Sequence, residues 1–159
     1  MYNLMTEIEA RPTTNRQRLH PSITAEQISR LVDDFYAQVR ENPRLSTIFA
    51  AHVLGDWNSH LQKMKSFWRS VLLKSGEYKG RPVPVHLKIK EIESADFEEW
   101  LRLFCATSKR TFESEAAELV NEAARRIATS LWLSRSQDPF AAMPTWSKSS
   151  PPENLNLSC

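Results

Sequence analysis

Glycine is scarce in this sequence, with three residues among 159, and long hydrophobic runs are missing. Few glycines leave few of the positive-φ turns on which hairpin-rich proteins depend, so a mainly helical chain is expected. The sequence contains no stretch of eighteen uninterrupted apolar residues, and its N-terminal region has no apolar segment of signal-peptide length. We therefore expect an all-α protein that is neither exported nor embedded in a membrane.

Cysteine and net charge are also low. The two cysteines, Cys105 and Cys159, are too few for the disulfide framework of a small secreted domain. Lys and Arg number 21 against 19 for Asp and Glu, and a net charge of +2 is too small for the field of a nucleic-acid binder. We expect a cytoplasmic protein with no nucleic-acid or membrane partner, as a monomer or weak dimer.

The chain has the length of one ordinary domain. Residues 1–21 are polar and show no hydrophobic period, which predicts a mobile N-terminal lead-in. Residues 137–159 are rich in proline, serine and asparagine, which predicts a mobile C-terminal tail, disordered or loosely docked. The folded domain is therefore expected to span residues 22–136.

Helix-start and helix-stop signals divide this domain. Thr24 and Gln27 form a capping-box pattern at the start of a first helix, and Pro43 ends that helix near Asn42. A short helical piece follows, and Asp56 is placed to cap the next helix. Two more long helices are predicted later in the chain, the first capped by Ser94 or Asp96 and the second running from about Ser114 to Arg135.

Two histidines are the candidate functional residues. His60 lies on an apolar helix face, one turn after Trp57, so its ring is expected to point inward. His86 follows Pro82 and Pro84, which allow only a short, constrained turn of helix. The helices around both are rich in Phe and Trp, and a flat apolar cofactor would fit between them. The phosphate loops, metal-binding pairs and nucleophile motifs of common enzymes are absent.

Each of these positions also has a purely structural interpretation. A histidine on an apolar face is more often a core or boundary residue than a ligand. Tyr36 can be a flanking tyrosine with its hydroxyl at the surface, and Trp100 can simply fill the core. The remaining aromatic residues are core by default. Position alone therefore leaves the function open.

Several short fragments, taken in order, resemble the group III truncated haemoglobins between about Ile28 and Ser134. The glycine pairs typical of the other two truncated groups are missing, which favours group III. The fragments are Phe35-Tyr36, Ile48-Phe49, Trp57-x-x-His60, Phe67-Trp68, Leu72-Leu73, Tyr78-x-Gly80-x-Pro82, His86-Leu87 and Trp100-Leu101-x-Leu103-Phe104.

The resemblance implies a truncated globin fold, a two-over-two helical sandwich around haem b. His86 would be the iron ligand, and Tyr36, His60 and Trp100 would line the distal pocket where O2, CO or NO binds. Phe49 would pack on the face of the haem. The full set of cofactor-binding residues that we predict is His86, Phe49, Met64, Phe67, Trp68, Tyr36, His60, Trp100 and Ile127.

The chemistry of these residues is consistent with that assignment. The Tyr36 hydroxyl and the Trp100 indole N–H are suitable donors to a bound gas that carries partial negative charge. They should slow O2 release, which suits ligand retention, redox or detoxification chemistry better than bulk transport. His60 can donate to the ligand or act as a gate that swings towards solvent. The haem carboxylates would need cationic partners, for which the sequence offers Arg81, Lys63 and Lys88.

Two other functions stay open at this point. The first is a haem-dependent enzyme, an NO dioxygenase or a peroxidase-like protein, in which the same donors polarise a reacting ligand and an external reductant completes the cycle. The second is a haem-free helical interaction module whose aromatic residues are only core.

Overall fold

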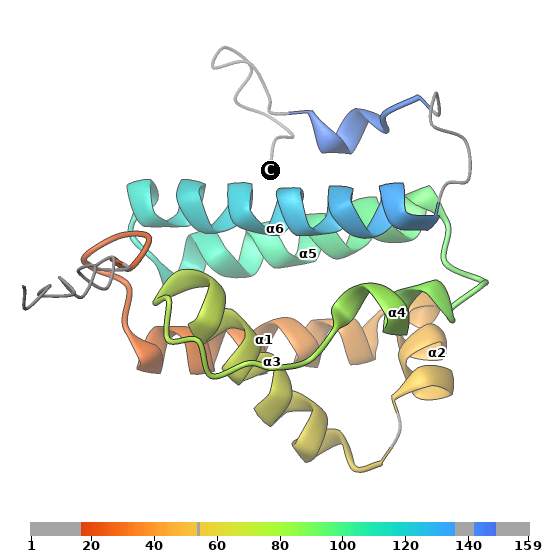
Figure 1. The fold of residues 1–159 in the computed structure, drawn as a ribbon, viewed down its shortest axis with the longest axis horizontal. Helices are drawn as coiled ribbons and strands as arrows, with labels where there is room; N and C mark the ends of the chain where they lie inside the picture. The colour runs from red at the N-terminus through yellow and green to blue at the C-terminus, as the bar shows by residue number, and fades with distance from the viewer. Residues whose placement is uncertain (1–16, 54, 136–141, 149–159) are drawn as a thin grey trace, which may run out of the picture.

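The structure is a computed structural model that describes residues 17–53, 55–135 and 142–148 (Figure 1). Within these ranges the chain is helical and contains no strand, which confirms the all-α prediction. None of the described helices has the length and apolarity that a membrane span requires. The elements are α1 (Ala25–Glu41), α2 (Pro43–His52), α3 (Trp57–Leu72), α4 (Pro82–Leu87), α5 (Ser94–Thr111), α6 (Ser114–Arg135) and a short 3-10 helix η1 (Thr145–Ser147).

The long helices form two layers. Helices α5 and α6 pack side by side in one layer, and α1 contacts both α5 above it and α3 beside it (Figure 1). The short helix α4 lies against α6, and α2 contacts α1 and α5. This arrangement is the predicted two-over-two sandwich, and the short helices α2 and α4 close it at one end.

Helix ends lie where local side chains satisfy the free backbone groups. Thr24 and Gln27 form the predicted capping box, in which Thr24 Oγ1 accepts from the Gln27 N–H and Gln27 Oε1 accepts from the Thr24 N–H. Asn42 ends α1 and also caps α2, because its side-chain oxygen accepts from two amides of the next helix. Asp56 caps α3 through the Ser59 N–H, as predicted.

The start of α5 differs in detail from the prediction. Its N-cap is Glu93, so the helix begins at Ser94 itself. Asp96 lies in the third helical position, and its carboxylate accepts from the Glu93 N–H at 2.9 Å. The prediction named Ser94 or Asp96 as the N-cap because their side chains suit that role. Asp96 instead caps the helix from inside its first turn, where its negative charge also interacts favourably with the helix dipole.

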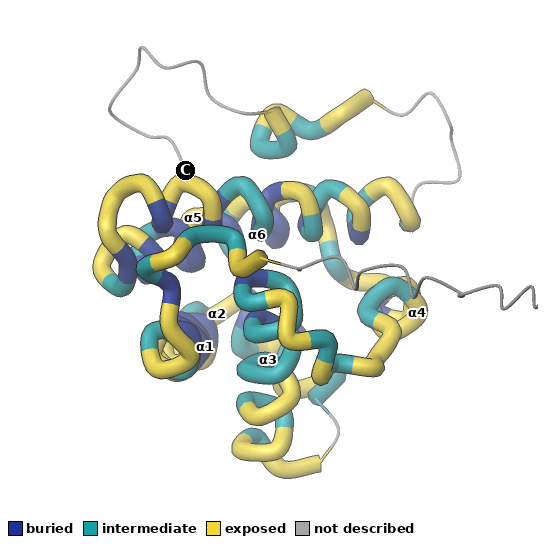
Figure 2. Tube along the Cα trace, turned by 60° about the vertical axis from the view of Figure 1, so that its left-hand side comes forward, coloured by how far each residue is buried: buried dark blue, intermediate teal, exposed yellow. Residues whose placement is uncertain are grey.

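The hydrophobic core lies between the two layers, where the inner faces of α1, α5 and α6 are buried (Figure 2). Its centre is an aromatic stack in which Phe104 lies between two tryptophans. The ring centroid of Phe104 is 4.7 Å from that of Trp68 and 5.3 Å from that of Trp100. Phe35 meets the Trp100 ring edge-on at 5.2 Å. The stack joins α3, α5 and α1 and so fixes one wall of the site described below.

Part of the predicted C-terminal tail packs on the domain. Trp146, in η1, stacks on Phe97 at 5.6 Å with an interplanar angle of 11° and meets Trp132 edge-on. Its indole N–H donates to Ser94 Oγ at 3.0 Å. Residues 142–148 therefore dock against α5 and α6. The other residues of the predicted tail, 137–141 and 149–159, lie outside the described residues.

Candidate functional site

A cavity of about 930 Å³ opens between the two layers and is closed at one end by α2 and α4. That volume is within the range of sites for large organic ligands. The structure brings all the predicted cofactor-binding residues to its wall, although they come from six different helices. They are Tyr36, Phe49, His60, Met64, Phe67, Trp68, His86, Trp100 and Ile127.

His86 is held in one ring orientation by the backbone of its own helix. Its Nδ1 lies 2.7 Å from the carbonyl oxygen of Pro82. Because a carbonyl only accepts, Nδ1 carries the proton and Nε2 is left with its lone pair. Pro82 is the first residue of α4, where its fixed φ suits the start of a helix. Burial lowers the pKa of the His86 ring, the bond to Pro82 opposes this, and the Arg135 cation lowers the pKa further. The ring is therefore neutral at pH 7.

Tyr36 lies at the end of the cavity near α2, and only 4% of its surface is exposed. Its ring meets those of Phe49, Trp57 and His60 edge-on, with centroids between 5.3 and 5.9 Å away. Within the described residues its hydroxyl has no hydrogen-bond partner. Burial raises the pKa of Tyr36 well above the usual range, so the hydroxyl keeps its proton. The structure thus presents an unused O–H donor at the cavity wall.

The His60 ring points inward, as predicted. It is perpendicular to Tyr36 and packs against Trp57 at 5.4 Å. Its Nε2 is buried and has no hydrogen-bond partner among the described residues. Burial, with a smaller contribution from the Lys63 cation, lowers the pKa of His60. A buried polar nitrogen without a partner costs free energy, and such an atom at a cavity wall indicates a ligand-binding site.

A tyrosine and a glycine shape the loop that leads into α4. The Tyr78 ring meets Phe67 edge-on at 5.2 Å, and its hydroxyl end lies where a Cβ of Gly80 would be. Any side chain at position 80 would displace that ring. Ser70 Oγ accepts from the Tyr78 N–H at 2.9 Å and fixes the loop to α3. This packing explains why a glycine stands two residues after Tyr78.

The cavity wall includes residues that the sequence analysis did not assign to it. Ile48, Ile89, Ile92, Phe97 and Leu131 all line it. Ile48 and Leu131 were visible as apolar positions of helices, but that pattern does not separate core from cavity. Ile89 and Ile92 lie in a connection without periodicity, so no sequence signal marked them.

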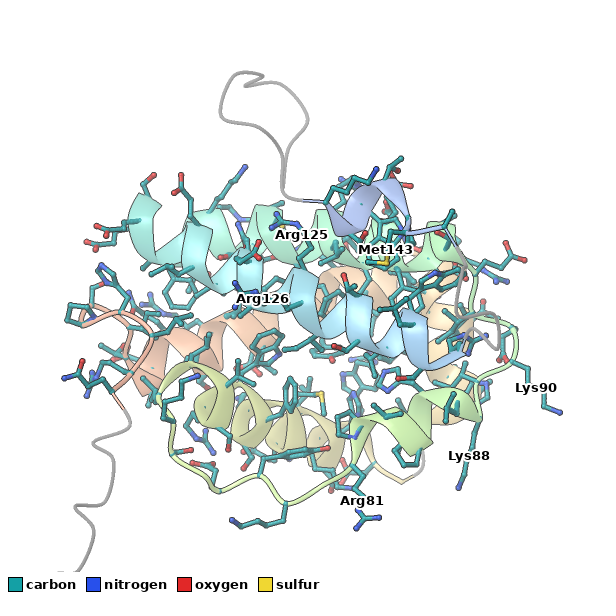
Figure 3. The ribbon with its side chains drawn as sticks, turned by 45° about the horizontal axis from the view of Figure 1, so that its top comes forward. Arg81, Lys88, Lys90, Arg125, Arg126 and Met143 are labelled. Carbon is teal, nitrogen blue, oxygen red and sulfur yellow. The ribbon has the colours of Figure 1, made fainter. Side chains whose placement is uncertain are left out.

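Two of the three cationic residues predicted as partners of the haem carboxylates line the cavity. Lys63 and Arg81 are among its lining residues, whereas Lys88 is not. Arg81 and Lys88 flank the two ends of α4, and both side chains project away from the molecule (Figure 3).

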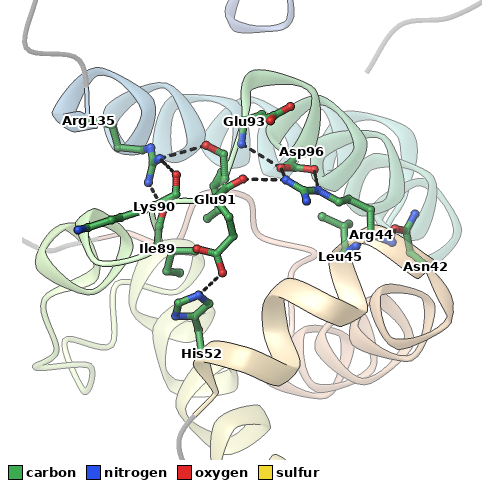
Figure 4. A network of polar contacts seen from close by, with 11 residues as sticks. Asn42, Arg44, Leu45, His52, Ile89, Lys90, Glu91, Glu93, Asp96 and Arg135 are labelled. Carbon is green, nitrogen blue, oxygen red and sulfur yellow. Dashed lines mark hydrogen bonds and ion pairs between the residues drawn. The ribbon is translucent and has the colours of Figure 1, made fainter.

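A polar network attaches the connection between α4 and α5 to the neighbouring helices (Figure 4). Arg44, on α2, makes two hydrogen bonds of 3.0 Å to the Asp96 carboxylate and a third, of 2.7 Å, to the Glu91 carbonyl. His52 bonds the Glu91 carboxylate. Burial of Asp96 by itself raises its pKa, but the Arg44 guanidinium and the Glu93 N–H outweigh this and lower the pKa. The network therefore requires an ionised Asp96.

We expect the pairing of Arg44 with Asp96 to stabilise the fold in a pH-dependent way. A carboxylate whose pKa is lowered by folding contributes stability above its unfolded pKa of about 3.9, and this is lost as the pH falls through the lower folded value. Arg44→Met should therefore lower the urea midpoint at pH 7, and its difference from the unchanged protein should shrink as the pH falls below about 4. Arg102→Met, which removes an exposed pair with Glu99, is the control and should change little. Equal midpoints at pH 7 for Arg44→Met and the unchanged protein would contradict the prediction.

Comparisons with known proteins give the same family from sequence and from structure. Residues 22–131 match the family described as bacterial-like globin. The chain is 31% identical over 112 residues to a group 3 truncated haemoglobin of Campylobacter jejuni, covering 68% of this chain and 87% of that protein. The crystal structure of a group III truncated haemoglobin from Campylobacter jejuni superposes with a TM-score of 0.68 at 30% identity, covering 74% of this chain and 95% of the other. This chain therefore belongs to the bacterial-like globins, as a truncated haemoglobin of group III.

Proposed function

We propose that this protein binds haem b through His86, and that it retains O2, CO or NO for redox or detoxification chemistry rather than for bulk O2 transport. Its family is one of haem proteins that bind diatomic ligands. The observation that carries the proposal for these residues is the bond from His86 Nδ1 to the Pro82 carbonyl. It leaves a neutral Nε2 with a free lone pair at the wall of a large cavity.

The residues present fit a porphyrin. The wall is largely aromatic and aliphatic, as a flat apolar ring requires, and its volume suits a large cofactor. The buried, unpartnered Nε2 of His60 is what a wall made for a polar ligand would show. When bound, haem supplies an iron centre with one coordination position for His86 and one for a gas.

Tyr36 and Trp100 would act as hydrogen-bond donors toward the gas. Tyr36 keeps its proton because burial raises its pKa, and Trp100 is a donor at any pH. Neither has a hydrogen-bond partner among the described residues, so both donors are available. A donor already positioned in a dry cavity strengthens binding of a ligand with partial negative charge, which supports retention over rapid release.

Lys63 and Arg81 are the proposed partners of the haem carboxylates. Both line the cavity, and neither forms an ion pair with another described residue. An exposed cation near a carboxylate gives a charge-assisted hydrogen bond without the cost of removing a buried charge from water. Lys88 follows the last residue of α4 and lies outside the cavity wall, so we assign it no such role.

Absorption spectra of the ferric, ferrous and carbonyl forms test the proposal. We expect a Soret band in the protein expressed with haem available, and a ferrous form whose spectrum indicates one histidine ligand. A protein that folds tightly, shows no Soret band and takes up no added haemin would instead be a haem-free helical module, and the proposal would be wrong.

A haem-dependent enzyme, either an NO dioxygenase or a peroxidase-like protein, is the second candidate. Three residues with polar groups, Tyr36, His60 and Trp100, line the cavity and favour it, because preorganised donors also polarise a reacting ligand. Steady-state turnover with an added reductant separates the two functions. Rates no higher than those of free haemin would exclude the enzyme and leave ligand binding as the function.

A further inference from the structure

The connection that follows His86 is held by polar contacts as well as by two isoleucines, Ile89 and Ile92, that face the cavity. Helix α4 has six residues and none of them is buried. Val85 and Leu87, on either side of His86, are 57% and 46% exposed. Figure 2 shows α4 as a largely exposed element at the edge of the molecule. Val83 is the residue of α4 that packs on the core, so polar contacts have a large share in fixing the position of the His86 backbone.

Arg135, the last residue of α6, provides that interaction (Figure 4). Its guanidinium donates to the carbonyl oxygens of His86 and Lys90, each at 3.2 Å, and of Ile92 at 3.0 Å. It also donates to the carbonyl of Ile89. One side chain thus binds four carbonyls along seven residues of chain. Carbonyls at the end of a helix have no helical partner, and a cation is favoured there by the helix dipole.

We infer that Arg135 is a positioning residue for His86, which fixes the main chain of the residue whose ring faces the cavity. His86 is then held at two points, its ring by the Pro82 carbonyl and its own carbonyl by Arg135. The inference rests on the proposed role of His86 as the haem ligand. Arg135 itself, on α6, does not line the cavity and acts on His86 through the backbone of α4.

The shape of the arginine head group is essential to this role. A guanidinium carries five N–H donors in a rigid plane, so it can reach several carbonyls at once, whereas an ammonium is a compact charge on a flexible stem. Without the guanidinium, the carbonyls of this connection that face solvent can bond water, and Ile89 and Ile92 still pack inward, so the domain should still fold. The His86 ring would then adopt a wider range of orientations at the cavity wall.

Arg135→Met is the test, because it keeps much of the aliphatic stem and removes all donors. The control is Arg126→Met, which removes an exposed arginine of the same helix whose partner among the described residues is Glu122. Both variants are measured as haem-loaded protein. The readouts are the rate of haem transfer to apomyoglobin, the iron–histidine stretching band in the ferrous resonance Raman spectrum, and hydrogen exchange at the amides of Lys88 and Ile89, which bond the carbonyls of Val85 and His86.

We expect haem transfer from Arg135→Met to be faster by about 10- to 100-fold, the usual cost of losing an outer partner of a metal ligand. The Raman band should shift or broaden, and exchange at Lys88 and Ile89 should accelerate while that of α1 stays unchanged. If Arg135 only stabilised the fold, Arg135→Met would lower the melting temperature and leave the iron–histidine band unshifted. Values equal to those of Arg126→Met would overturn the inference.

Arg135→Lys keeps the inference testable if the methionine variant does not fold. It retains the charge and loses the fork of donors, so we expect the same three changes in smaller measure. An unaltered Raman band and haem-transfer rate in Arg135→Lys, with Arg135→Met unfolded, would also count against positioning. Failure of the proposed function gives a different result, because the unchanged protein would then show no Soret band.

Discussion

Replacing His86 with alanine is expected to abolish tight haem binding while leaving the fold intact. The residue is on a helix without buried side chains, so its removal opens no cavity in the core. What is lost is the free Nε2 at the cavity wall. Loss of an outer partner of a metal ligand costs about 10- to 100-fold in affinity, so loss of the ligand itself should cost more than about 100-fold. Haem titration followed at the Soret band measures this.

Added imidazole and a second histidine sharpen the experiment. Imidazole should restore a histidine-like spectrum to His86→Gly, because the small molecule can occupy the space of the missing ring. His20→Ala is the control, since His20 lies outside the cavity and contacts Glu113 and Glu115 on the far side of the domain. Unaltered haem affinity in His86→Ala would remove this residue from the proposed role.

Tyr36→Phe and Trp100→Phe are expected to speed O2 release from the ferrous protein. Each removes a donor that has no partner among the described residues. A neutral hydrogen bond contributes about 0.5–1.5 kcal/mol and 1.4 kcal/mol is tenfold in an equilibrium constant. We expect up to about tenfold from Tyr36→Phe and up to about 100-fold from the double variant. Stopped-flow dissociation measures both rates.

The Tyr36 substitution keeps the shape of the site. Phenylalanine retains the edge-on ring contacts with Phe49, Trp57 and His60, so a change in rate reports the hydroxyl. Tyr78→Phe is the matched control, a tyrosine of the same cavity whose ring contacts Phe67 and none of the rings around Tyr36. If both tyrosine variants release O2 at the rate of the unchanged protein, Tyr36 is no donor to the ligand.

Local sequence signals were sufficient to predict most of the fold. The helix caps are local: the side chains of Thr24, Asn42 and Asp56 accept from backbone amides no more than three residues later. Short sequence patterns are therefore enough to indicate them. The N-cap of α5 is Glu93 and not Ser94 or Asp96, and the Asp96 carboxylate also binds Arg44, 52 residues earlier, a partner that no local pattern indicates. Residues 142–148 dock through Trp146, and their composition gave no sign of the Phe97 and Trp132 surface that they meet.

The site was predicted by resemblance more than by pattern. Helical spacing placed His60 and Trp100 on inward faces, but the same spacing holds for any core residue. The family resemblance then selected which inward residues share one wall, and the structure brings them together at one cavity. Their roles toward haem and gas remain predictions. Arg135 was visible only as the end of a helix, because its partners are four main-chain oxygens from residues 86–92.

The use of main-chain acceptors has a consequence for how this region tolerates mutation. Every residue type has a carbonyl, so substitutions at positions 89, 90 and 92 that preserve the course of the chain delete none of the oxygens bound by Arg135. Pro82 likewise contributes its oxygen and not its ring to His86. Related chains can therefore diverge along this stretch and keep the same support for the histidine, provided that residues 89 and 92 still suit the cavity wall and an arginine stays at the end of α6.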